Sequence, residues 1–460
     1  MSWRLAELAR ACGGTLRGSG EVEIKSVSTD TRSLPSGALF VAVKGESFDG
    51  HDFLADAARL GAAAVLIARA PDPSLTVPAV VVGDTIEALG ALARAHRASF
   101  AGPVVAITGS NGKTTTKELC AHLLESAGRR VRRTPGNLNN HIGLPLSILG
   151  LAAADEVLVV ELGMNHEGEI DALTRIADPT VGAITNVAPA HLGLLGSLEA
   201  IARAKGELFG RMRADATAIV NADDANCVAQ SARFAGAKLR FAVKAPADFG
   251  ARDVRVEAGK ASYTLVCPAG EAPVRMGAPG LHLVDDGLCA AAAAFASGSL
   301  GARPLDAMQR GLESFAGVPG RGVVLRTREG VRVVDDCYNA NPHSVGRALE
   351  TLAQLREGGR TIAVLGDMFE LGEGEAALHA GVGRAAAATA VDVLVAVGPL
   401  SRHMARAARE AGVARVLEAD GAEDAAAQVR ANARAGDVVL VKASHGMKLE
   451  RVVQILTESR

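Results

Sequence analysis

The chain has 460 residues, of which 48% are hydrophobic and 22% charged, and its formal net charge is -2. This length allows about three domains, and a nearly neutral charge with only 3% aromatic residues argues against nucleic-acid binding. The six cysteines lie far apart without a C-x-x-C pair, the N-terminus lacks a signal-type apolar core, and the longest apolar run, 288–296, is too short to span a bilayer. We therefore expect a cytoplasmic protein that binds neither nucleic acid nor membranes.

The first hundred residues alternate short strands and helices, which predicts an α/β domain over 1–100. Strands are expected near 22–27, 38–43, 63–67 and 77–82, and helices over 52–60 and from an N-cap at Thr85 to about 99. Two polar loops, 28–32 and 44–51, follow strands directly. Loops at strand ends are common ligand sites, but Ser, Asp and Gly also make ordinary turns. The pattern alone leaves both interpretations open.

A glycine-rich loop provides the strongest functional signal. An Ala-Gly-Pro break at 101–103 and an apolar run at 104–108 precede Gly109-Ser110-Asn111-Gly112-Lys113-Thr114-Thr115, and a helical pattern then extends to 127. The order strand, glycine loop, helix is typical of phosphate-binding loops, in which backbone N–H groups and the helix N-terminus attract phosphates. Lys113 would reach the terminal phosphates and Thr114 can bind Mg²⁺. The alternative is a glycine turn with a chance lysine before a helix.

Strands and helices continue to alternate after this loop, which predicts a doubly wound parallel sheet in a central domain, 101–318. Strands are expected at 157–161, 181–187 and 216–221, helices near 168–176, 197–213, 285–299 and 304–314, and a β-rich passage at 253–267. Glu161 ends a buried strand, where P-loop proteins commonly present an acid to nucleotide-bound magnesium. His191 follows the next strand and Lys205 lies on a largely apolar helix, but a turn histidine and a solvated lysine fit these two patterns as well.

A Gly-Val-Pro-Gly break at 317–320 leads into a third α/β domain, which we expect to be Rossmann-like over 319–460. A hairpin is predicted over 323–335 with its turn at 329–330. Strands at 361–365, 392–397, 413–417 and 437–441 then alternate with helices.

Motifs in all three segments resemble those of the Mur ligases, the ATP-dependent amino-acid-adding enzymes of peptidoglycan synthesis. The motifs that carry the resemblance are 109–115, 136–145 (GNLNNHIGLP), 161–164, 186–191 and 204–207. Within the family, 335–342 (DDCYNANP) and 364–372 (VLGDMFELG) are most similar to the member that adds D-alanyl-D-alanine to UDP-N-acetylmuramoyl-tripeptide. The resemblance implies an acyl phosphate intermediate and the last cytoplasmic step of peptidoglycan precursor synthesis, with consequences for the cell wall, cell shape and division.

The resemblance also implies roles for individual residues. ATP would be held by Gly109, Ser110, Asn111, Gly112, Lys113, Thr114 and Thr115, with Arg321, Asp336 and Asn341 closing over it from the third domain. Two Mg²⁺ ions would be bound by Thr114, Glu161, His191 and a carbamylated Lys205. The uridine nucleotide would contact Ser28, Thr29, Asp30, Arg32, Phe48, Asp49, Gly50 and His51. The candidate catalytic residues are Lys113, His191 and Lys205, and we expect a monomer.

Two segments depart from the family pattern. Leu283 and Asp286 stand where the family has asparagines that help to hold adenine, and Lys442-Ala443-Ser444-His445 stands in place of Lys-Gly-Ser-Arg. An ionised aspartate accepts hydrogen bonds but cannot donate them, so the mode of adenine binding stays open.

The alternative functions are those of another amide ligase of the superfamily, such as a diaminopimelate- or lysine-adding enzyme or a folylpolyglutamate synthase, and of a non-catalytic copy that binds only the nucleotide sugar. The shortened glycine loop disfavours a general P-loop kinase or transport ATPase. The sequence does not distinguish diaminopimelate from lysine in the acceptor peptide.

Overall fold

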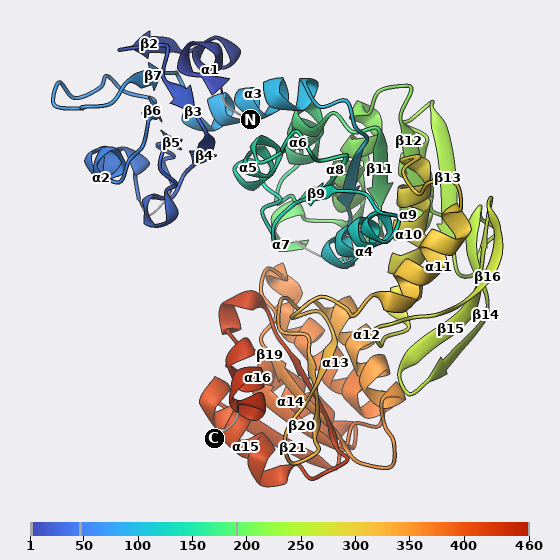
Figure 1. Ribbon diagram of the computed structural model, residues 1–460. Coiled ribbons are helices and arrows are strands. Elements are labelled where there is room, and N and C mark those ends of the chain that lie inside the picture. The colour runs from blue at the N-terminus through green and yellow to red at the C-terminus, as the bar shows by residue number, and fades with distance from the viewer. Residues whose placement is uncertain (1–2, 46–47, 190–191, 459–460) are drawn as a thin grey trace.

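The computed structural model describes residues 3–45, 48–189 and 192–458, and Figure 1 shows three successive groups of strands and helices along the chain. Within these residues the strands form sheets of two, five, nine and six strands. The alternation of strands and helices is thereby confirmed, whereas the domain limits 1–100, 101–318 and 319–460 stay predictions. Among the described helices, none is long and apolar enough to cross a membrane.

The N-terminal five-stranded sheet has the order β2 (Thr15–Arg17), β7 (Ala79–Val81), β6 (Ala64–Ile67), β5 (Ala38–Val41) and β4 (Ser26–Ser28). The strand predicted over 22–27 is divided, because β3 (Glu23–Ile24) pairs with β1 (Trp3–Arg4) whereas β4 pairs with β5. The helical elements of this part are α1 (Leu5–Ala11), η1 (Thr31–Ser33), η2 (Gly50–Phe53), α2 (Leu54–Arg59) and α3 (Thr85–Ala98).

The predicted N-cap of α3 at Thr85 is wrong by one residue. The side chain of Asp84 accepts the backbone N–H groups of Ile86 and Glu87, so Asp84 is the N-cap. The Thr85 hydroxyl instead donates to the carbonyl of Ala42 at 2.9 Å. A long-range hydrogen bond, which the local pattern does not contain, thus decides which of two good capping residues is used.

The nine-stranded sheet has the order β16 (Gly270–Arg275), β15 (Lys260–Cys267), β14 (Phe249–Glu257), β13 (Ala237–Ala242), β12 (Thr217–Asn221), β11 (Val181–Ile184), β8 (Val104–Thr108), β10 (Val157–Glu161) and β9 (Val131–Arg133). From β9 at one edge through β10, β8, β11, β12 and β13 to β14, adjacent strands are parallel. Strands β14, β15 and β16 form an antiparallel meander. The doubly wound parallel sheet is therefore confirmed, and the predicted β-rich passage belongs to an antiparallel extension of the same sheet.

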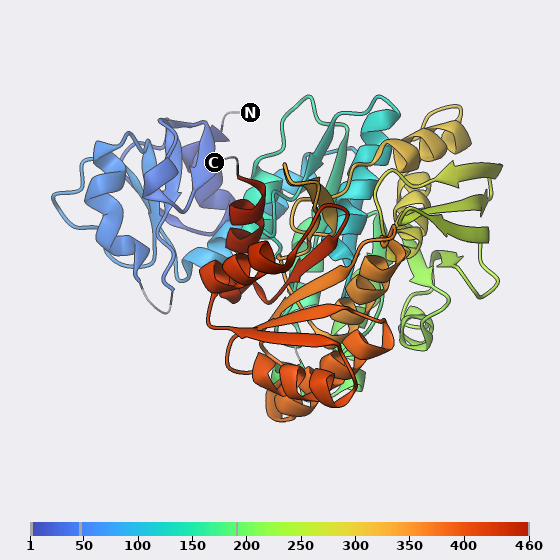
Figure 2. The same cartoon turned by 90° about the horizontal axis from the view of Figure 1, so that it is seen from below.

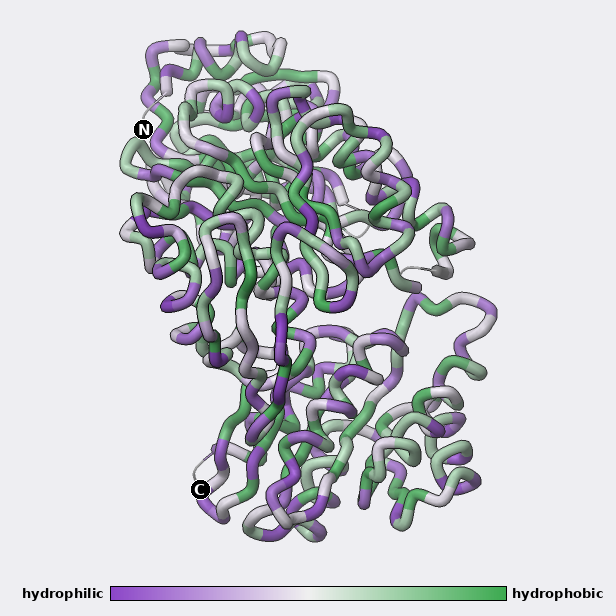
Figure 3. Tube along the Cα trace, turned by 90° about the vertical axis from the view of Figure 1, so that its right-hand side faces the viewer, coloured by the Kyte–Doolittle hydropathy of each residue, from purple (hydrophilic) through white to green (hydrophobic). Residues whose placement is uncertain are grey.

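Both faces of this sheet are covered, which explains why β8, β10 and β11 are almost entirely apolar. Successive residues of β8 enter two different cores: Val104 and Ala106 pack on one face, Val105 and Ile107 on the other. The first core also receives α3, α5 (Gly143–Leu149), α6 (Glu169–Ala177) and α8 (Leu198–Arg211), and the second receives α4 (Lys113–Ser126), α10 (His282–Ala296) and α11 (Pro304–Ser314). In Figure 3, hydrophobic stretches of the trace run through the inside of the molecule. Two short helices, α7 (Leu192–Leu195) and α9 (Ala225–Ser231), complete this part.

The C-terminal sheet has the order β17 (Val323–Arg326), β18 (Arg332–Asp335), β22 (Val438–Lys442), β19 (Thr361–Gly366), β20 (Val393–Val397) and β21 (Arg415–Ala419). The β17–β18 hairpin is antiparallel and the other pairs are parallel, as predicted. One face is covered by α12 (Pro342–Gln354), α13 (Glu375–Ala388) and α14 (Ser401–Glu410), and the other by α15 (Ala422–Asn432) and α16 (Glu450–Thr457). Short turns η3 (Gly372–Gly374) and η4 (His445–Met447) follow β19 and β22.

The C-terminal group lies next to the middle one in Figures 1 and 2, and an ion pair joins them. Arg347 of α12 approaches Asp285 of α10 to 2.6 Å between Nη2 and Oδ2. Helix α12 begins in the loop after β18, so this contact brings the carboxyl ends of strands from two sheets toward one another. Ligands of open α/β sheets bind at such edges.

Candidate active site

The glycine loop joins β8 to α4, and two of its glycines are required by geometry. Gly109 has φ +148° and Gly112 has φ +78°, a backbone region that favours glycine. A β-carbon added at Gly109 would collide with Oγ1 of Thr185, and one at Gly112 would collide with Oδ1 of Asp286. The loop therefore packs tightly against its neighbours and presents its backbone N–H groups at the start of α4.

The end of β11 holds the glycine loop in place. The backbone N–H of Ser110 donates to the carbonyl of Asn186 at 2.9 Å, and the N–H of Asn111 donates to Oδ1 of Asn186 at 3.0 Å. The Ser110 hydroxyl donates to the carbonyl of Ala188 at 2.8 Å. Because β11 is the parallel neighbour of β8, polar residues that follow both strands meet at the same sheet edge. Residues 186–188 thus support the loop through the side chain of Asn186 and two backbone carbonyls.

Two lysines converge on one carbonyl group of the loop. Nζ of Lys113 donates to the Gly109 oxygen at 2.8 Å, and Nζ of Lys205, from α8, donates to the same oxygen at 3.0 Å. Lys205 is buried, with 2% of its surface exposed. Burial, and then the charge of Lys113, lower the pKa of Lys205 well below its usual range, and burial also lowers the pKa of Lys113. Two lysine side chains thus meet at one carbonyl group at this end of the cavity.

A buried carboxylate lies beside the loop. Glu161, which ends β10, is 1% exposed. Its Oε2 accepts a hydrogen bond from the Thr114 hydroxyl at 2.9 Å, and its Oε1 accepts one from Nδ2 of Asn139 at 2.8 Å. Carboxylate and hydroxyl oxygens are ligands that Mg²⁺ prefers, so the chemistry of this pair fits the predicted metal site.

The third group of elements contacts the loop directly. Nη2 of Arg321 donates to Oγ1 of Thr114 at 2.9 Å, and the guanidinium carbon lies 3.9 Å from the centre of the Tyr338 ring. Asn341, the N-cap of α12, uses both ends of its amide: Oδ1 accepts the N–H of Ser344 and Nδ2 donates to Oδ1 of Asn111 at 2.8 Å. Arg321 and Asn341 thus contact the glycine loop, and the closure of Arg321, Asp336 and Asn341 over ATP stays a prediction.

A second ion pair lies further along the same edge. Lys442 at the end of β22 and Asp336 after β18 approach to 2.7 Å, and Lys442 also donates to the carbonyl of Asn339 at 2.9 Å. His445 lies near Tyr338, with ring centroids 5.6 Å apart. The altered 442–445 motif therefore still contacts the cavity wall through its lysine and its histidine.

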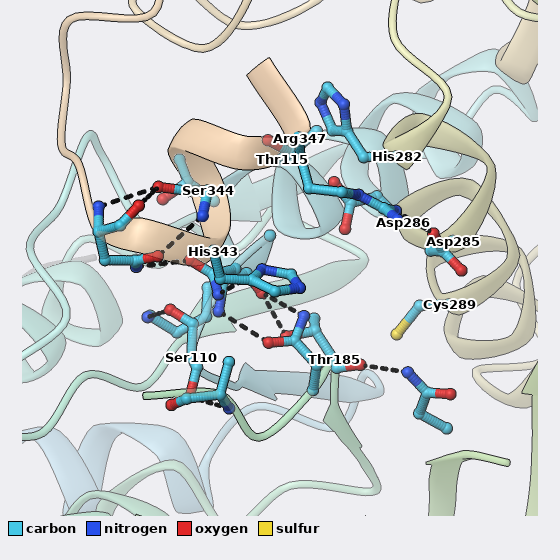
Figure 4. A pocket seen from close by; sticks show the side chains of 18 of the residues that line it. Ser110, Thr115, Thr185, His282, Asp285, Asp286, Cys289, His343, Ser344 and Arg347 are labelled. Atoms are coloured by element: carbon cyan, nitrogen blue, oxygen red, sulfur yellow. Dashed lines mark hydrogen bonds and ion pairs between the residues drawn. The ribbon is translucent and has the colours of Figure 1, made fainter. Parts of the chain in front are cut away.

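These groups line one cavity of about 1060 Å³, large enough for a nucleotide together with a second substrate. Figure 4 shows a close view of it, with Asp285, Asp286 and Cys289 of α10 on one side and Ser110 and Ser344 on the other. The predicted site residues among its lining are Ser110, Asn111, Gly112, Lys113, Thr114, Thr115, Glu161, Lys205, Arg321, Asp336 and Asn341. Gly109 takes part through its carbonyl group, and His191 lies outside the described residues.

The two positions that lack the family asparagines differ in their surroundings. Leu283 is 3% exposed and belongs to the apolar core under the sheet. Asp286 lines the cavity, and burial together with the charge of Asp285 raises its pKa to about 8. His282 also lines the cavity, and its buried Nδ1 has no partner among the described residues. Burial lowers the pKa of His282 to about 4, so its imidazole is neutral at pH 7.

The residues predicted to contact uridine do not line this cavity, and several of them form local contacts. Asp30 caps η1 and pairs with Arg32 at 2.7 Å. Asp49 caps η2 and approaches Nδ1 of His51 at 2.6 Å, while Nε2 of His51 accepts the N–H of Ala68. Their role in binding a nucleotide sugar stays a prediction.

Some residues of the site had no role assigned from the sequence. Asn139 binds Glu161, Tyr338 stacks on Arg321, and buried Lys117 of α4 donates to the carbonyls of Thr134 and Gly136. Asn139 belongs to a run of asparagines after a strand, and Tyr338 is one of only two tyrosines in the chain. Polar or aromatic residues in such loops are a usable signal, but the spacing does not reveal their partners.

Comparison with known proteins agrees with the geometry. Family models match residues 23–97 ("Mur ligase family, catalytic domain"), 107–294 ("Mur ligase middle domain") and 320–445 ("Mur ligase, glutamate ligase domain"). The UDP-N-acetylmuramoyl-tripeptide–D-alanyl-D-alanine ligase of Escherichia coli K12 is 36% identical over 461 residues, which cover 100% of this chain and 99% of that protein.

Solved structures are similar over the same length. A crystal structure of MurF from Acinetobacter baumannii superposes with a TM-score of 0.90 at 32% identity, covering 100% of this chain and 99% of that chain. The MurF ligase of Thermotoga maritima in complex with ADP has a TM-score of 0.83 at 31% identity, covering 94% of this chain and 97% of that chain.

Proposed function

The chain belongs to the Mur ligase family, and on this premise we propose that it is the ATP-dependent ligase that joins D-alanyl-D-alanine to UDP-N-acetylmuramoyl-tripeptide. The observation that carries the proposal is the meeting of Lys113, the Thr114–Glu161 pair and Arg321 in one cavity. Ligases of this name from Escherichia coli and Bacillus subtilis are each 36% identical to the chain, over 100% and 95% of its length. The product is the peptidoglycan precursor that carries the complete pentapeptide.

The reaction has two chemical steps. A carboxylate oxygen of the tripeptide attacks the γ-phosphorus of ATP, a new O–P bond forms, the bond to the β,γ-bridging oxygen breaks, and ADP leaves. The amine of D-alanyl-D-alanine then attacks the carbonyl carbon of the acyl phosphate, inorganic phosphate leaves, and the amine loses a proton. Activation is necessary because an unactivated carboxylate would have to expel an oxide ion, a very poor leaving group.

The residues of the cavity supply positive charge and position. Lys113 and the loop N–H groups bind the terminal phosphates, and Arg321 adds a second cation from the third group of elements. Because Arg321 and Asn341 reach the loop only when the two sheets face each other, closure and the positioning of cations occur together. Closure also keeps water away from the acyl phosphate.

Magnesium would be bound by Thr114 and Glu161, with His191 and Lys205 completing two sites. When bound, Mg²⁺ supplies charge that offsets the repulsion between the phosphate and carboxylate anions. Lys205 would serve as a carbamate, formed when its uncharged amine adds carbon dioxide. Burial favours this modification because it increases the fraction of the uncharged amine at neutral pH.

The uridine nucleotide would bind to the loops 28–32 and 48–51. The first of these loops follows β4 and the second lies beyond the end of β5, and these two strands are parallel neighbours. Loops at the carboxyl ends of adjacent parallel strands are suited to ligand binding. The peptide part of the bound nucleotide sugar would then extend from these two loops to the cavity at the glycine loop. The monomeric state and the cytoplasmic location remain predictions.

Phosphate release with a panel of acceptors tests the proposal. The purified protein is incubated with MgATP, UDP-N-acetylmuramoyl-tripeptide and D-alanyl-D-alanine, and each is omitted in turn. We expect phosphate release only when all three are present. The tripeptide is supplied in two forms, with diaminopimelate or with lysine as its third residue. An amide product should form with at least one of them. Turnover without D-alanyl-D-alanine, or with free diaminopimelate, lysine or glutamate as the acceptor, would contradict it.

A further inference from the structure

We propose that Lys117 is a positioning residue of the ligase: its buried ammonium group fixes the loop 134–139, and through Asn139 this loop sets the orientation of the Glu161 carboxylate. The inference rests on the proposed function, because it takes Glu161 to bind the Mg²⁺ that accompanies ATP. It gives a role in the reaction to a buried charged residue that is not part of the cavity lining.

The side chain of Lys117 is fully buried, and its donors are fully used. Lys117 lies on α4, one turn after Lys113. Its Nζ donates to the carbonyl of Thr134 at 2.8 Å and to that of Gly136 at 3.1 Å, and approaches Oε1 of Glu118 to 2.8 Å. An ammonium group has three N–H donors, so each of them has an acceptor here and the side chain is held in one position.

Stability alone does not account for a lysine at this place. Taking a charge out of water is costly, and a buried ion pair can often be replaced by apolar residues without loss of stability. Other buried positions of the same helix, Leu119, Leu123 and Leu124, pack in an apolar core. The charge at position 117 therefore has its use in what it contacts, and two of its three acceptors are backbone oxygens of one loop.

The loop 134–139 has few other anchors. Residues 135–138 are exposed. Among the described residues, the backbone of 135–138 forms a hydrogen bond outside the loop only with Lys117, through the carbonyl of Gly136. Gly136 has φ +52°, a left-handed conformation that glycine adopts readily. Without Lys117, hydrogen bonds would hold the backbone of this loop only at its two ends.

Both ends of the loop are joined to Glu161. Oγ1 of Thr134 accepts the backbone N–H of Glu161 at 3.1 Å. At the other end, Nδ2 of Asn139 donates to Oε1 of Glu161 at 2.8 Å, and the Asn139 carbonyl accepts the N–H of Gly163 at 2.8 Å. The remaining carboxylate oxygen, Oε2, accepts the Thr114 hydroxyl. A shift of the loop would therefore turn the carboxylate away from Thr114, its proposed partner in binding Mg²⁺.

Helix α4 carries both the phosphate-binding end and the anchor of the loop. Thr114 lies in its first turn and Lys117 directly follows, so one rigid element sets the distance between the glycine loop and the loop 134–139. Removing a group that orients a metal ligand commonly weakens metal binding by about 10- to 100-fold. Lys117 acts on Glu161 through Asn139, so we expect an effect at the lower end of this range.

Lys117→Met tests the inference, because it keeps an unbranched side chain and removes the donors. Hydrogen exchange in residues 136–140 would be measured without ligands. The Mg²⁺ requirement would be measured in two ways, from the initial rate of phosphate release and from the calorimetric Kd of ADP at a series of Mg²⁺ concentrations. We expect faster exchange and an increase of about tenfold in the Mg²⁺ concentration that gives half of each effect. The Kd of ADP without Mg²⁺ and the kcat at saturating Mg²⁺ should change much less.

Glu118→Gln is the matched control. It removes the charge that pairs with Lys117, but it keeps both carbonyl contacts and an oxygen that can accept the third donor. Exchange and Mg²⁺ requirement should match those of wild type. If Lys117→Met does not fold, because it leaves the Glu118 carboxylate without this lysine, the double variant Lys117→Met/Glu118→Gln removes both charges and takes its place.

Unchanged exchange in residues 136–140 would overturn the inference, and so would an unchanged Mg²⁺ requirement despite faster exchange. Equal effects of Glu118→Gln and Lys117→Met would also overturn it, because charge balance and not the hold on the loop would then be the cause. Exchange and ADP binding need no acceptor, so these results stand apart from the ligase assay. Absence of ligase activity in wild type with every acceptor would overturn the proposed function instead.

Discussion

Nη2 of Arg321 lies 2.9 Å from Oγ1 of Thr114, although 207 positions separate the two residues. Arg321 precedes the first strand of the C-terminal sheet, and Thr114 belongs to the first turn of the helix after the glycine loop. The hydrogen bond places a guanidinium group at the start of the helix that follows the glycine loop. Because the two residues belong to different sheets, Arg321 contacts this helix only in an arrangement that brings the middle and C-terminal sheets together.

Arg321→Lys is expected to lower kcat by about 10²-fold with a much smaller change in the Kd of ATP. Lysine keeps the charge but loses the fork of donors and the stacking on Tyr338, which is 3.9 Å from the guanidinium carbon. Steady-state kinetics combined with nucleotide calorimetry separates the two effects. Arg252→Lys, on an exposed strand of the antiparallel extension, is the control and should leave kcat unchanged. A normal kcat for Arg321→Lys would show that the guanidinium is not used in phosphoryl transfer.

Lys113→Ala should abolish turnover and leave the fold intact. Among the described residues the Lys113 amine donates to two carbonyls of its own loop, at 2.8 Å to Gly109 and 3.3 Å to Ser110, so its loss should remove the proposed phosphate contact and little packing. The expected fall in kcat is at least about 10³-fold, as for other preorganised cations at a transferring phosphoryl group. Thermal unfolding of the variant is the control for structure. Retained activity would contradict the assignment of the glycine loop.

Lys205→Ala is expected to be inactive, and the activity of wild type should depend on bicarbonate at low pH. The lowered pKa of Lys205 keeps more of its amine uncharged near neutral pH, and only that form adds carbon dioxide. As the pH falls the amine takes up a proton and the carbamate is lost, so added bicarbonate should restore activity in part. Carbon-13 NMR of protein equilibrated with labelled bicarbonate would detect the carbamate carbon. Full activity with an unmodified lysine would refute the modification.

Asn139→Asp should raise the Mg²⁺ concentration needed for half-maximal activity or lower the maximal rate. Nδ2 of Asn139 donates to Oε1 of Glu161 at 2.8 Å, and an aspartate there would place a second acceptor against a buried carboxylate. Asn139→Ala removes the same hydrogen bond without adding charge and should have the smaller effect. A magnesium titration of the initial rate measures both. Identical curves for the two variants and wild type would mean that Asn139 does not position Glu161.

Asp286→Asn should flatten the dependence of stability on pH. The folded-state pKa of Asp286 is about 8, and the unfolded value is that of an ordinary aspartate, about 4. The folded state therefore holds a proton that the unfolded state lacks between these values, and wild-type stability falls as the pH rises through this window. Urea unfolding at pH 5.5 and 8 should show a larger loss for wild type than for the variant. Asp56→Asn, at an exposed position, is the control and should behave like wild type.

Local patterns predicted the central elements of the site well, because strand, glycine loop and helix are adjacent in sequence. The roles that the sequence missed depend on contacts between distant segments. Asn139 meets Glu161 across 22 positions, and Asp84 rather than Thr85 caps α3 because the Thr85 hydroxyl reaches Ala42, 43 positions away. The same limit applies to the altered motif in α10, since only the structure places Leu283 in the core and Asp286 in the cavity.

The N-terminal side chains Asp30 and Asp49 each cap a short turn, which is the role that Ser, Asp and Gly patterns equally predict. A capping carboxylate can keep its turn while the loop binds a ligand through other groups. Binding of a uridine nucleotide to Arg32→Ala and His51→Ala variants would distinguish the two roles.

The amide of Asn341 forms hydrogen bonds with two partners, the first turn of α12 and the side chain of Asn111. Any ligand that tightens the hold on Asn111 therefore also protects that helix end from fraying, by mass action on the folded form. Hydrogen exchange in residues 342–345 should accordingly slow when a nucleotide binds to the glycine loop of the middle sheet. The exchange rate at the start of α12 would then report whether the nucleotide site is occupied.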